Sequence, residues 1–474
     1  MKGTNIVAVN ALRGLFERVV LPHAALFLFV ASFLTFYGQL DRKQSGDTFA
    51  TVYTAVAVVR DGSVRLDPYY SILQERAGEH PSQLERGPDG HLYSDFPIAS
   101  SLFGVPAVGV LAVVGVSPEN WGAHMEASMF SGALVAAGAV ALFFVLLTRL
   151  TTRARAFLAA AILAWATPVW TITGQGLWQH GPLMLALVGA LLAAVDRRPL
   201  IAGSCLASMV AIRPSSLVIA ACLIPLVARP PSGLLRAVAG AVPPLAALAV
   251  YNQLAFGCPT CMGYDDDLRG DAGFNGSFLE GFSGNLVSPG RGIFVYAPVL
   301  LLTLAGVVLG RRRLLYACTA AGAAGQVALV SFWFEWWGGE AFGPRQLVDA
   351  LPLFALLLVP VLDRWSSSPS FRGAFGVLAL WSVGVQFLGA ALWPGTHWYD
   401  THAVREFATW WDPTDTELTA FFSDPGRLAG RGALMGLVVL AALAAALGAA
   451  AGASRLPRLL RGRPAAGVPS GRSF

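Results

Sequence analysis

The sequence predicts an all-α integral membrane protein with about 12 transmembrane helices, within a range of about 11 to 13. Hydrophobic residues make up 55% of the 474 residues and charged residues only 13%, roughly half the charged share of an ordinary soluble domain. Apolar runs recur along the chain, and about 20 such residues suffice for one helix to span a bilayer. We expect one polytopic membrane domain over residues 1–452 and a basic, disordered cytoplasmic tail over 453–474.

The first element is an uncleaved anchor helix over residues 21–38. Lys2, Arg13 and Arg18 precede it, and no small-residue cleavage site follows it, as in an anchor rather than a signal peptide. Basic residues mark the cytoplasmic ends of membrane spans. The N-terminus is therefore expected in the cytoplasm.

Twelve further apolar runs follow, at 97–116, 127–148, 156–172, 182–195, 199–212, 214–228, 234–252, 292–310, 314–332, 347–362, 373–393 and 430–452. If every run crossed, the basic clusters 149–155 and 311–313 would lie outside, against the positive-inside rule. If 97–116 instead forms a juxtamembrane or re-entrant helix, as its two prolines and three glycines favour, every basic cluster faces the cytoplasm. The cytoplasmic segments then hold 20 of the 33 basic residues but only three acids, and both termini lie inside.

Residues 38–126 then form one long extracytoplasmic loop with juxtamembrane helices. Asp47 precedes an apolar stretch, 48–59, that suits a helix lying in the membrane interface. In one interpretation Asp47 is the N-cap of that helix. In another it is a carboxylate at the membrane surface that takes a proton from an acceptor hydroxyl. The two interpretations are compatible.

Three cationic or titratable side chains stand where outer loops meet spans: His180 in "LWQHGP", Arg291 in "SPGRG" and Arg345 in "GPRQ". Each arginine follows a Gly-Pro or Pro-Gly break, where a planar guanidinium beside exposed backbone donors suits phosphate oxygens. The alternative for the arginines is interfacial anchoring. His180 is either a hydrogen-bonded structural residue or a further phosphate contact.

Two acids, Glu335 and Glu340, flank "WWGG" in "FEWWGGE", residues 334–340. Tryptophans alone indicate an interfacial aromatic belt. With glycines and acids beside them, they favour an aromatic platform whose carboxylates bind sugar hydroxyls. The predicted sugar- or acceptor-binding residues are Glu335, Trp336, Trp337, Glu340 and, in the loop before His180, Gln179.

The order of these stretches resembles glycosyltransferases of the GT-C class, in particular their poorly characterised bacterial members. The stretches are "SGD", "LWQHGP", "YN...FG...GY", "SPGRGIFVYAPV" and "WWGGEAFGPRQLVDALP", and the resemblance covers most of residues 20–400. It implies sugar transfer from a polyprenyl phosphate or pyrophosphate carrier to a lipid or glycan acceptor, outside the inner membrane. Carried onto this chain, the catalytic base would be Asp47, with Asp41 as the alternate. Several better-known members have a lysine before the proline of the next helix, whereas Asp95 and Phe96 stand here.

The sequence indicates no firm cofactor and no nucleic-acid partner, because no basic stripe is interleaved with exposed aromatics. Asp265, Asp266 and Asp267 could bind a divalent cation through oxygen ligands, although a solvated loop is the favoured interpretation, and no metal ligands are assigned. Cys258 and Cys261 are spaced like a redox or metal pair. Since two further zinc ligands are not found nearby, two loop thiols, bridged or free, are expected there.

Two other classes of function also fit a polytopic chain. A secondary transporter or a lipid or glycan flippase would be expected to show related halves and polar breaks at mid-membrane. A non-enzymatic scaffold would have no use for clustered outer charges. In this sequence the halves differ and polarity collects at one surface, so an enzyme is the expected class.

Overall fold

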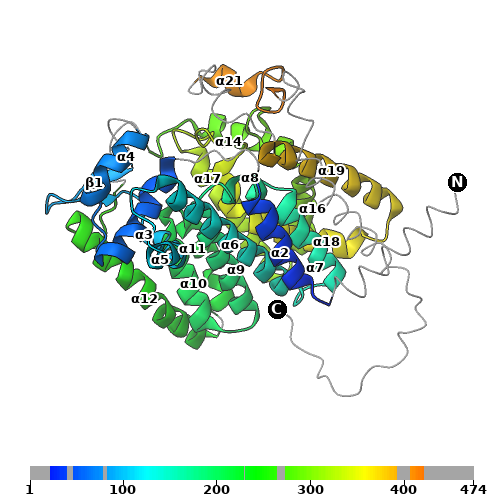
Figure 1. The fold of residues 1–474 in the computed structure, drawn as a ribbon. Helices are drawn as coiled ribbons and strands as arrows, with labels where there is room; N and C mark the ends of the chain where they lie inside the picture. The colour runs from blue at the N-terminus through cyan, green and yellow to red at the C-terminus, as the bar shows by residue number, and fades with distance from the viewer. Residues whose placement is uncertain are drawn as a thin grey trace.

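The computed structural model describes residues 22–39, 46–77, 83–228, 230–263, 273–391 and 406–420. These residues form a mainly helical protein (Figure 1). Among them, five helices are long and apolar enough to cross a membrane: Trp121–Leu147, Pro231–Phe256, Leu314–Ser331, Arg345–Trp365 and Pro369–Ala391. The all-α membrane class predicted from composition is confirmed at this level.

The described residues up to Val113 contain one apolar helix of 14 residues and the elements of the long first loop. Its elements are α2 (Ala24–Tyr37), the 3-10 turn η2 (Gly46–Thr48), α3 (Phe49–Asp61), η3 (Asp67–Tyr69), α4 (Tyr70–Ala77), β1 (Leu84–Arg86), β2 (Leu92–Ser94), η4 (Ser101–Phe103) and α5 (Val105–Val113). Strands β1 and β2 pair antiparallel as a hairpin.

The remaining elements build the bundle and its outer loops. They are α6 (Trp121–Leu147), α7 (Arg153–Trp165), α8 (Val169–Thr173), α9 (His180–Val195), α10 (Pro199–Ile212), η5 (Pro214–Ser216), α11 (Leu217–Val227), α12 (Pro231–Phe256), α14 (Phe278–Val287), α15 (Ile293–Tyr296), η6 (Pro298–Leu301), α16 (Leu302–Gly310), α17 (Leu314–Ser331), η7 (Arg345–Ala350), α18 (Leu351–Trp365), α19 (Pro369–Ala391) and α21 (Phe407–Trp411).

Helices α7 and α18 lie in the core, whereas α12 lies at the periphery. In the most apolar 18-residue window of each span, 89% of Arg345–Trp365 is buried but only 17% of Pro231–Phe256. Exposed leucines and valines cover α12 from Leu234 to Leu254, as on a helix that faces lipid. It packs on α10 through Gly203 and Gly240, where an added Cβ would strike the other helix's backbone. Such small-residue contacts are typical of membrane helices.

Helix α5 is too short to cross a bilayer. Its nine residues reach about 14 Å at 1.5 Å per residue, less than half of the roughly 30 Å hydrocarbon core. Val110 and Val113 on it are 63% and 88% exposed. The prediction that residues 97–116 form a juxtamembrane element rather than a span agrees with this length.

Three sequence-based expectations need correction or stay open. The stretch 48–59 is helical, and Phe49–Ala57 is buried within the protein, so α3 packs against protein groups along most of its length and its expected place at the membrane interface stays open. The expected spans 156–172 and 292–310 are broken, the first before Pro168 and the second at Ala297, because proline interrupts helical hydrogen bonding. The last expected span, 430–452, and the tail lie outside the described residues.

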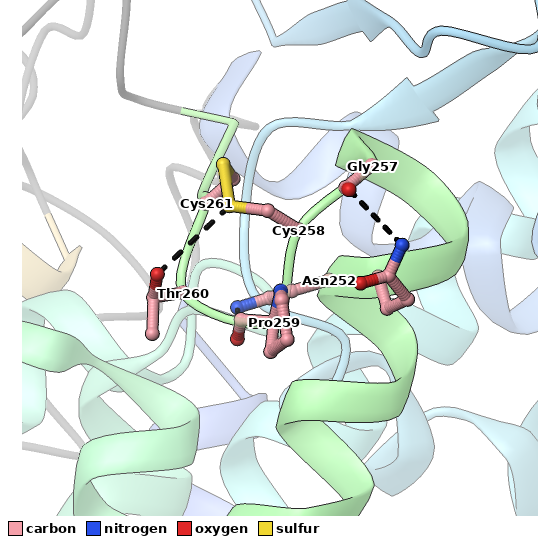
Figure 2. The surroundings of a disulfide bond; sticks show 7 residues. Asn252, Gly257, Cys258, Pro259, Thr260 and Cys261 are labelled. Atoms are coloured by element: carbon pink, nitrogen blue, oxygen red, sulfur yellow. Dashed lines mark hydrogen bonds between the residues drawn. A yellow bond between two sulfur atoms is a disulfide. The ribbon is translucent and has the colours of Figure 1, made fainter.

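A disulfide joins Cys258 and Cys261 at the turn that follows α12 (Figure 2), with their Cα atoms 5.3 Å apart. The turn lies against the β1–β2 hairpin, because Gly87 approaches the carbonyl of Ala255 and Gly257 approaches Pro88. Of the two forms that the sequence left open, the bridged one is present. The disulfide therefore closes the turn that packs the end of α12 against the β1–β2 hairpin.

Charged groups gather at both ends of α18. Before its first residue, Asp349 is fully buried and contacts Arg213 and His180. In its last turn, Asp363 accepts a bond of 2.9 Å from Arg155. The two acids are 14 residues apart, or about 21 Å along a helix. The two polar ends are therefore well separated by apolar core.

Candidate functional site

Asp47 and Arg345 meet at the end of the bundle whose loops are predicted to lie outside the membrane. Arg345 Nη1 donates a hydrogen bond to Asp47 Oδ2, with 2.5 Å between the nitrogen and the oxygen. The two residues are 298 positions apart in the chain, and the sequence predicted both as parts of one site. The Asp47 side chain is 36% exposed and that of Arg345 is 14% exposed. Because its carboxylate is partly open to solvent, Asp47 can exchange this contact for another.

The capping interpretation of Asp47 is wrong. Thr48 occupies the N-cap position of α3, and no side-chain cap hydrogen bond is formed there. Asp47 lies instead in the η2 turn, and its carboxylate contacts the guanidinium of Arg345. The alternate base, Asp41, lies outside the described residues.

The glycines of "WWGGEAFGPR" set the position of Arg345. Gly338, Gly339 and Gly343 all have positive φ angles, of 82°, 67° and 74°, which favour glycine over residues with a Cβ. The last of them precedes Pro344, and its carbonyl accepts a bond of 2.9 Å from the Arg345 amide. The loop therefore doubles back immediately before the η7 turn and brings Arg345 to the η2 turn.

The Trp178 ring packs against the Arg345 guanidinium. The Arg345 Cζ atom lies over the Trp178 ring, 4.6 Å from its centroid. A cation over an indole face is attracted by about 0.5–2 kcal/mol. Trp178 belongs to the segment between α8 and α9, so three segments distant in sequence build the site: η2, the loop before α9 and η7.

One turn after Arg345, Asp349 forms a buried network. Its Oδ1 lies 2.7 Å from His180 Nδ1, and its Oδ2 lies 3.0 Å from Arg213 Nη1. Arg213 also donates through Nη2 to Gln346 Oε1 at 2.8 Å. Asp349 is fully buried and His180 is 3% exposed. The network ties the starts of α9 and η7 to the end of α10, and thereby fixes the turn that carries Arg345.

His180 is therefore a structural residue of this network rather than an open phosphate contact. Its imidazole is buried between a carboxylate and a guanidinium. The interpretation of His180 as a hydrogen-bonded residue at a helix start agrees with its contacts. Its effect on the site passes through Asp349 and the η7 turn.

Arg291 is fully buried and engaged with protein groups. Its Nη1 forms an ion pair with Glu417 Oε1, and its Nη2 donates to the Gly339 carbonyl at 2.9 Å. The Trp410 ring lies 4.3 Å from its Cζ atom. Both Arg291 and Glu417 are 0% exposed. The geometry does not support the predicted donor-phosphate contact at Arg291, because a phosphate would have to displace a buried carboxylate.

Residues 406–420 lie over the "SPGRG" and "WWGG" loops. Ser288 donates to the Trp410 carbonyl at 2.6 Å, and Glu417 Oε2 accepts from Tyr296 at 2.8 Å and from the Gly343 amide at 2.9 Å. In Figure 1, α21 lies at the end of the molecule beside α14. The segment is thus held by a buried carboxylate and by backbone hydrogen bonds.

Trp336 and Trp337 belong to this covered region. They are 3% and 7% exposed and pack with Trp410, which stacks on Trp337 at 6.1 Å between ring centroids. Trp336 also donates to Glu280 on α14 at 3.0 Å. In this conformation the rings form a core cluster, and the predicted open platform is not present.

The other predicted sugar-binding residues surround the same loops. Glu335 is half-buried and Glu340 is exposed, on either side of the two positive-φ glycines. Gln179 is half-buried at the N-terminal end of α9, between Trp178 and His180. Of the ten predicted site residues, the structure brings Asp47 and Arg345 into direct contact.

Within the described parts of the chain, no group of three or more His, Cys, Asp or Glu side chains is arranged to hold a metal ion. The acidic run Asp265, Asp266 and Asp267 lies outside those parts. No metal ligand is assigned to the site.

No family model matches this chain. No curated protein matches it either.

Four contributors to the site were not predicted: Trp178, Arg213, Asp349 and Glu417. A signal existed for two of them. Arg213 is a basic residue on the predicted outer side, where few are expected, and Asp349 is an acid inside an apolar run, which is costly unless it has a partner. No local pattern indicated Glu417, because its pairing with Arg291 depends on how residues 406–420 fold back.

Proposed function

We propose that this protein is a GT-C-class membrane glycosyltransferase that moves a sugar from a polyprenyl phosphate or pyrophosphate carrier to an acceptor on the extracytoplasmic face. The observation that carries the proposal is the contact of Asp47 with Arg345. A candidate base in the first outer loop thereby stands beside a candidate phosphate ligand at the start of a core helix. Acid and cation at one membrane surface are the two groups that this reaction requires.

In the proposed reaction, Arg345 binds the phosphate of the carrier and stabilises it as the leaving group. Asp47 accepts the proton of the acceptor hydroxyl as the oxygen attacks the anomeric carbon. Because the attacking oxygen and the leaving phosphate lie on opposite faces of the sugar, the reaction inverts the anomeric centre. His180, Arg213 and Asp349 act as positioning residues for Arg345.

The proposal includes about twelve crossings, with both termini in the cytoplasm of the inner membrane. Its support is the arrangement of charges along the bundle. Arg149 pairs with Asp196 and Arg155 with Asp363, and all four lie on the predicted cytoplasmic side. Asp47, Arg345 and Asp349 lie on the predicted outer side.

A secondary transporter or flippase is the alternative. Such a protein would bind its cargo near mid-membrane, whereas the proposed site lies at the outer ends of the helices. Deleting the gene and comparing extracted envelope lipids and glycans tests the choice. Loss of one sugar from a glycolipid or glycan, with unglycosylated acceptor accumulating outside, supports the transferase. Accumulation of a complete glycolipid on the cytoplasmic side would instead support the flippase.

A further inference from the structure

Two buried N–H donors at the site have no partner among the described residues. They are Nε of Arg345 and Nε1 of Trp178. Trp178 is 6% exposed and the side chain of Arg345 is 14% exposed. A buried donor without an acceptor is unfavourable, and protein interiors rarely keep one without a reason.

The two donors belong to side chains in direct contact, because Arg345 Cζ lies 4.6 Å from the centroid of the Trp178 ring. A ligand that satisfies both must carry several acceptor oxygens within a few ångströms and must tolerate a cation. A phosphate group has these properties, and arginine binds it with more than one N–H. A neutral sugar hydroxyl can also accept hydrogen bonds, but it carries no negative charge to pair with the guanidinium.

Asp47 accepts the side-chain hydrogen bond that Arg345 donates from Nη1. The carboxylate thus occupies a position that a phosphate oxygen would compete for. Since the Asp47 side chain is 36% exposed, its carboxylate can turn to solvent or to a substrate without breaking buried packing contacts. Arg345 cannot follow it far, because Trp178 and the η7 turn hold it.

We propose that Arg345 and the Trp178 N–H together bind the donor phosphate. The phosphate replaces the Asp47 carboxylate as the hydrogen-bond partner of Arg345, and the released carboxylate acts as the base. This inference rests on the proposed function and adds the second phosphate contact and the order of binding. The donor binds first, because until then the Asp47 carboxylate is occupied by Arg345. The acceptor hydroxyl then binds at the released carboxylate.

Sugar transfer then occurs as a single displacement at the anomeric carbon. The acceptor O–H bond breaks and its proton goes to Asp47, while the oxygen forms a bond to the anomeric carbon. The bond from that carbon to the phosphate oxygen breaks, and its electron pair leaves with the carrier phosphate at Arg345 and Trp178. Asp47 releases the proton to water and returns to Arg345 when the carrier leaves.

Equilibrium binding of radiolabelled farnesyl phosphate to the full-length protein in nanodiscs tests the proposal without requiring turnover. Asp47→Asn removes the competing charge, so farnesyl phosphate should bind roughly tenfold more tightly, the factor that corresponds to 1.4 kcal/mol. Trp178→Phe keeps the ring beneath Arg345 but removes the N–H. It should weaken binding about five- to tenfold.

Trp178→Phe should also leave thermal stability unchanged or slightly raised, because the lost N–H had no partner. Trp165→Phe is the matched control, since Trp165 is equally buried but donates to Thr35 Oγ1 at 2.9 Å. That variant should be less stable and should bind farnesyl phosphate as the wild type does. A purely structural role for Trp178 would give the pattern of the control.

Weaker or unchanged binding in Asp47→Asn, or unchanged binding in Trp178→Phe, would overturn the proposal even if sugar transfer is demonstrated. Inorganic phosphate distinguishes the source of the ligand. If it shows the same two effects while farnesyl phosphate does not bind, the phosphate site stands and the lipid-linked donor of the proposed function fails.

Discussion

The buried pair of Arg291 and Glu417 provides a test of how the outer loops are held. Arg291→Met leaves the Glu417 carboxylate buried without its cation, although Tyr296 and the Gly343 amide still donate to it at 2.8 and 2.9 Å. Both partners are 0% exposed. Removing one member of a buried pair typically costs 3–5 kcal/mol, so we expect the free energy of unfolding to fall by about 4 kcal/mol.

The assay is denaturant unfolding in mixed detergent micelles, followed by tryptophan fluorescence. Arg65→Met is the matched control, because Arg65 pairs with Asp89 at 3.1 Å but the two side chains are 49% and 33% exposed. That change should cost less than about 1 kcal/mol. The double variant Arg291→Met/Glu417→Leu should cost clearly less than the sum of its single changes, because it leaves no buried charge unpaired. If Arg291→Met changes stability no more than Arg65→Met and weakens donor binding instead, Arg291 is a phosphate ligand and the structural assignment is wrong.

Three further predictions concern the phosphate ligand, the glycine-rich loop and the topology. Arg345→Lys keeps the charge but loses the planar guanidinium, so transfer should fall by about 10- to 100-fold while exposed Arg65→Lys changes little; equal small losses in a steady-state transfer assay would leave Arg345 without a special role. Gly343→Ala places a Cβ 2.8 Å from the Tyr296 ring at a φ of 74°, so the free energy of unfolding should fall by about 1–3 kcal/mol. Gly384→Ala in α19, where a Cβ meets nothing within 4 Å, should leave stability unchanged. Similar melting temperatures for the two variants would contradict the loop geometry. For the topology, single cysteines are introduced into a variant whose free cysteines Cys205, Cys222 and Cys318 are alanine. A cysteine replacing Glu119 should react with an impermeant maleimide in intact cells, and one replacing Arg311 should react only after permeabilisation. The reverse pattern would invert the topology.

The helices were predictable because hydrophobic length is a local property of the sequence. The expected run 199–212 coincides with α10, Pro199–Ile212, and 314–332 with α17, Leu314–Ser331. Breaks within runs were not predicted, although Pro168 and Pro298 marked them. Whether short helices such as α9 to α11 cross the membrane depends on tilt and packing, which periodicity does not contain.

The candidate site was only partly predictable for a different reason. Asp47 and Arg345 stood out because each is a charged residue in a polar frame beside apolar runs, yet their contact depends on tertiary structure. Arg291 and Arg345 occupy similar glycine-rich frames in the sequence, but one is buried on Glu417 and the other faces Asp47. The difference comes from residues 406–420, whose position no local pattern encodes.

Sugar transfer by the Asp47→Asn protein tests the central claim most directly. Asparagine keeps the size of the side chain but cannot accept a proton as a base. In proteoliposomes with a labelled polyprenyl-linked donor, transfer should therefore drop by roughly 10²- to 10⁴-fold, while donor binding is not weakened and membrane insertion stays normal. Asp41→Asn is assayed beside it as the alternate base. Full transfer by Asp47→Asn would contradict the assignment of Asp47, and full transfer by both variants would remove the first-loop carboxylates from the mechanism.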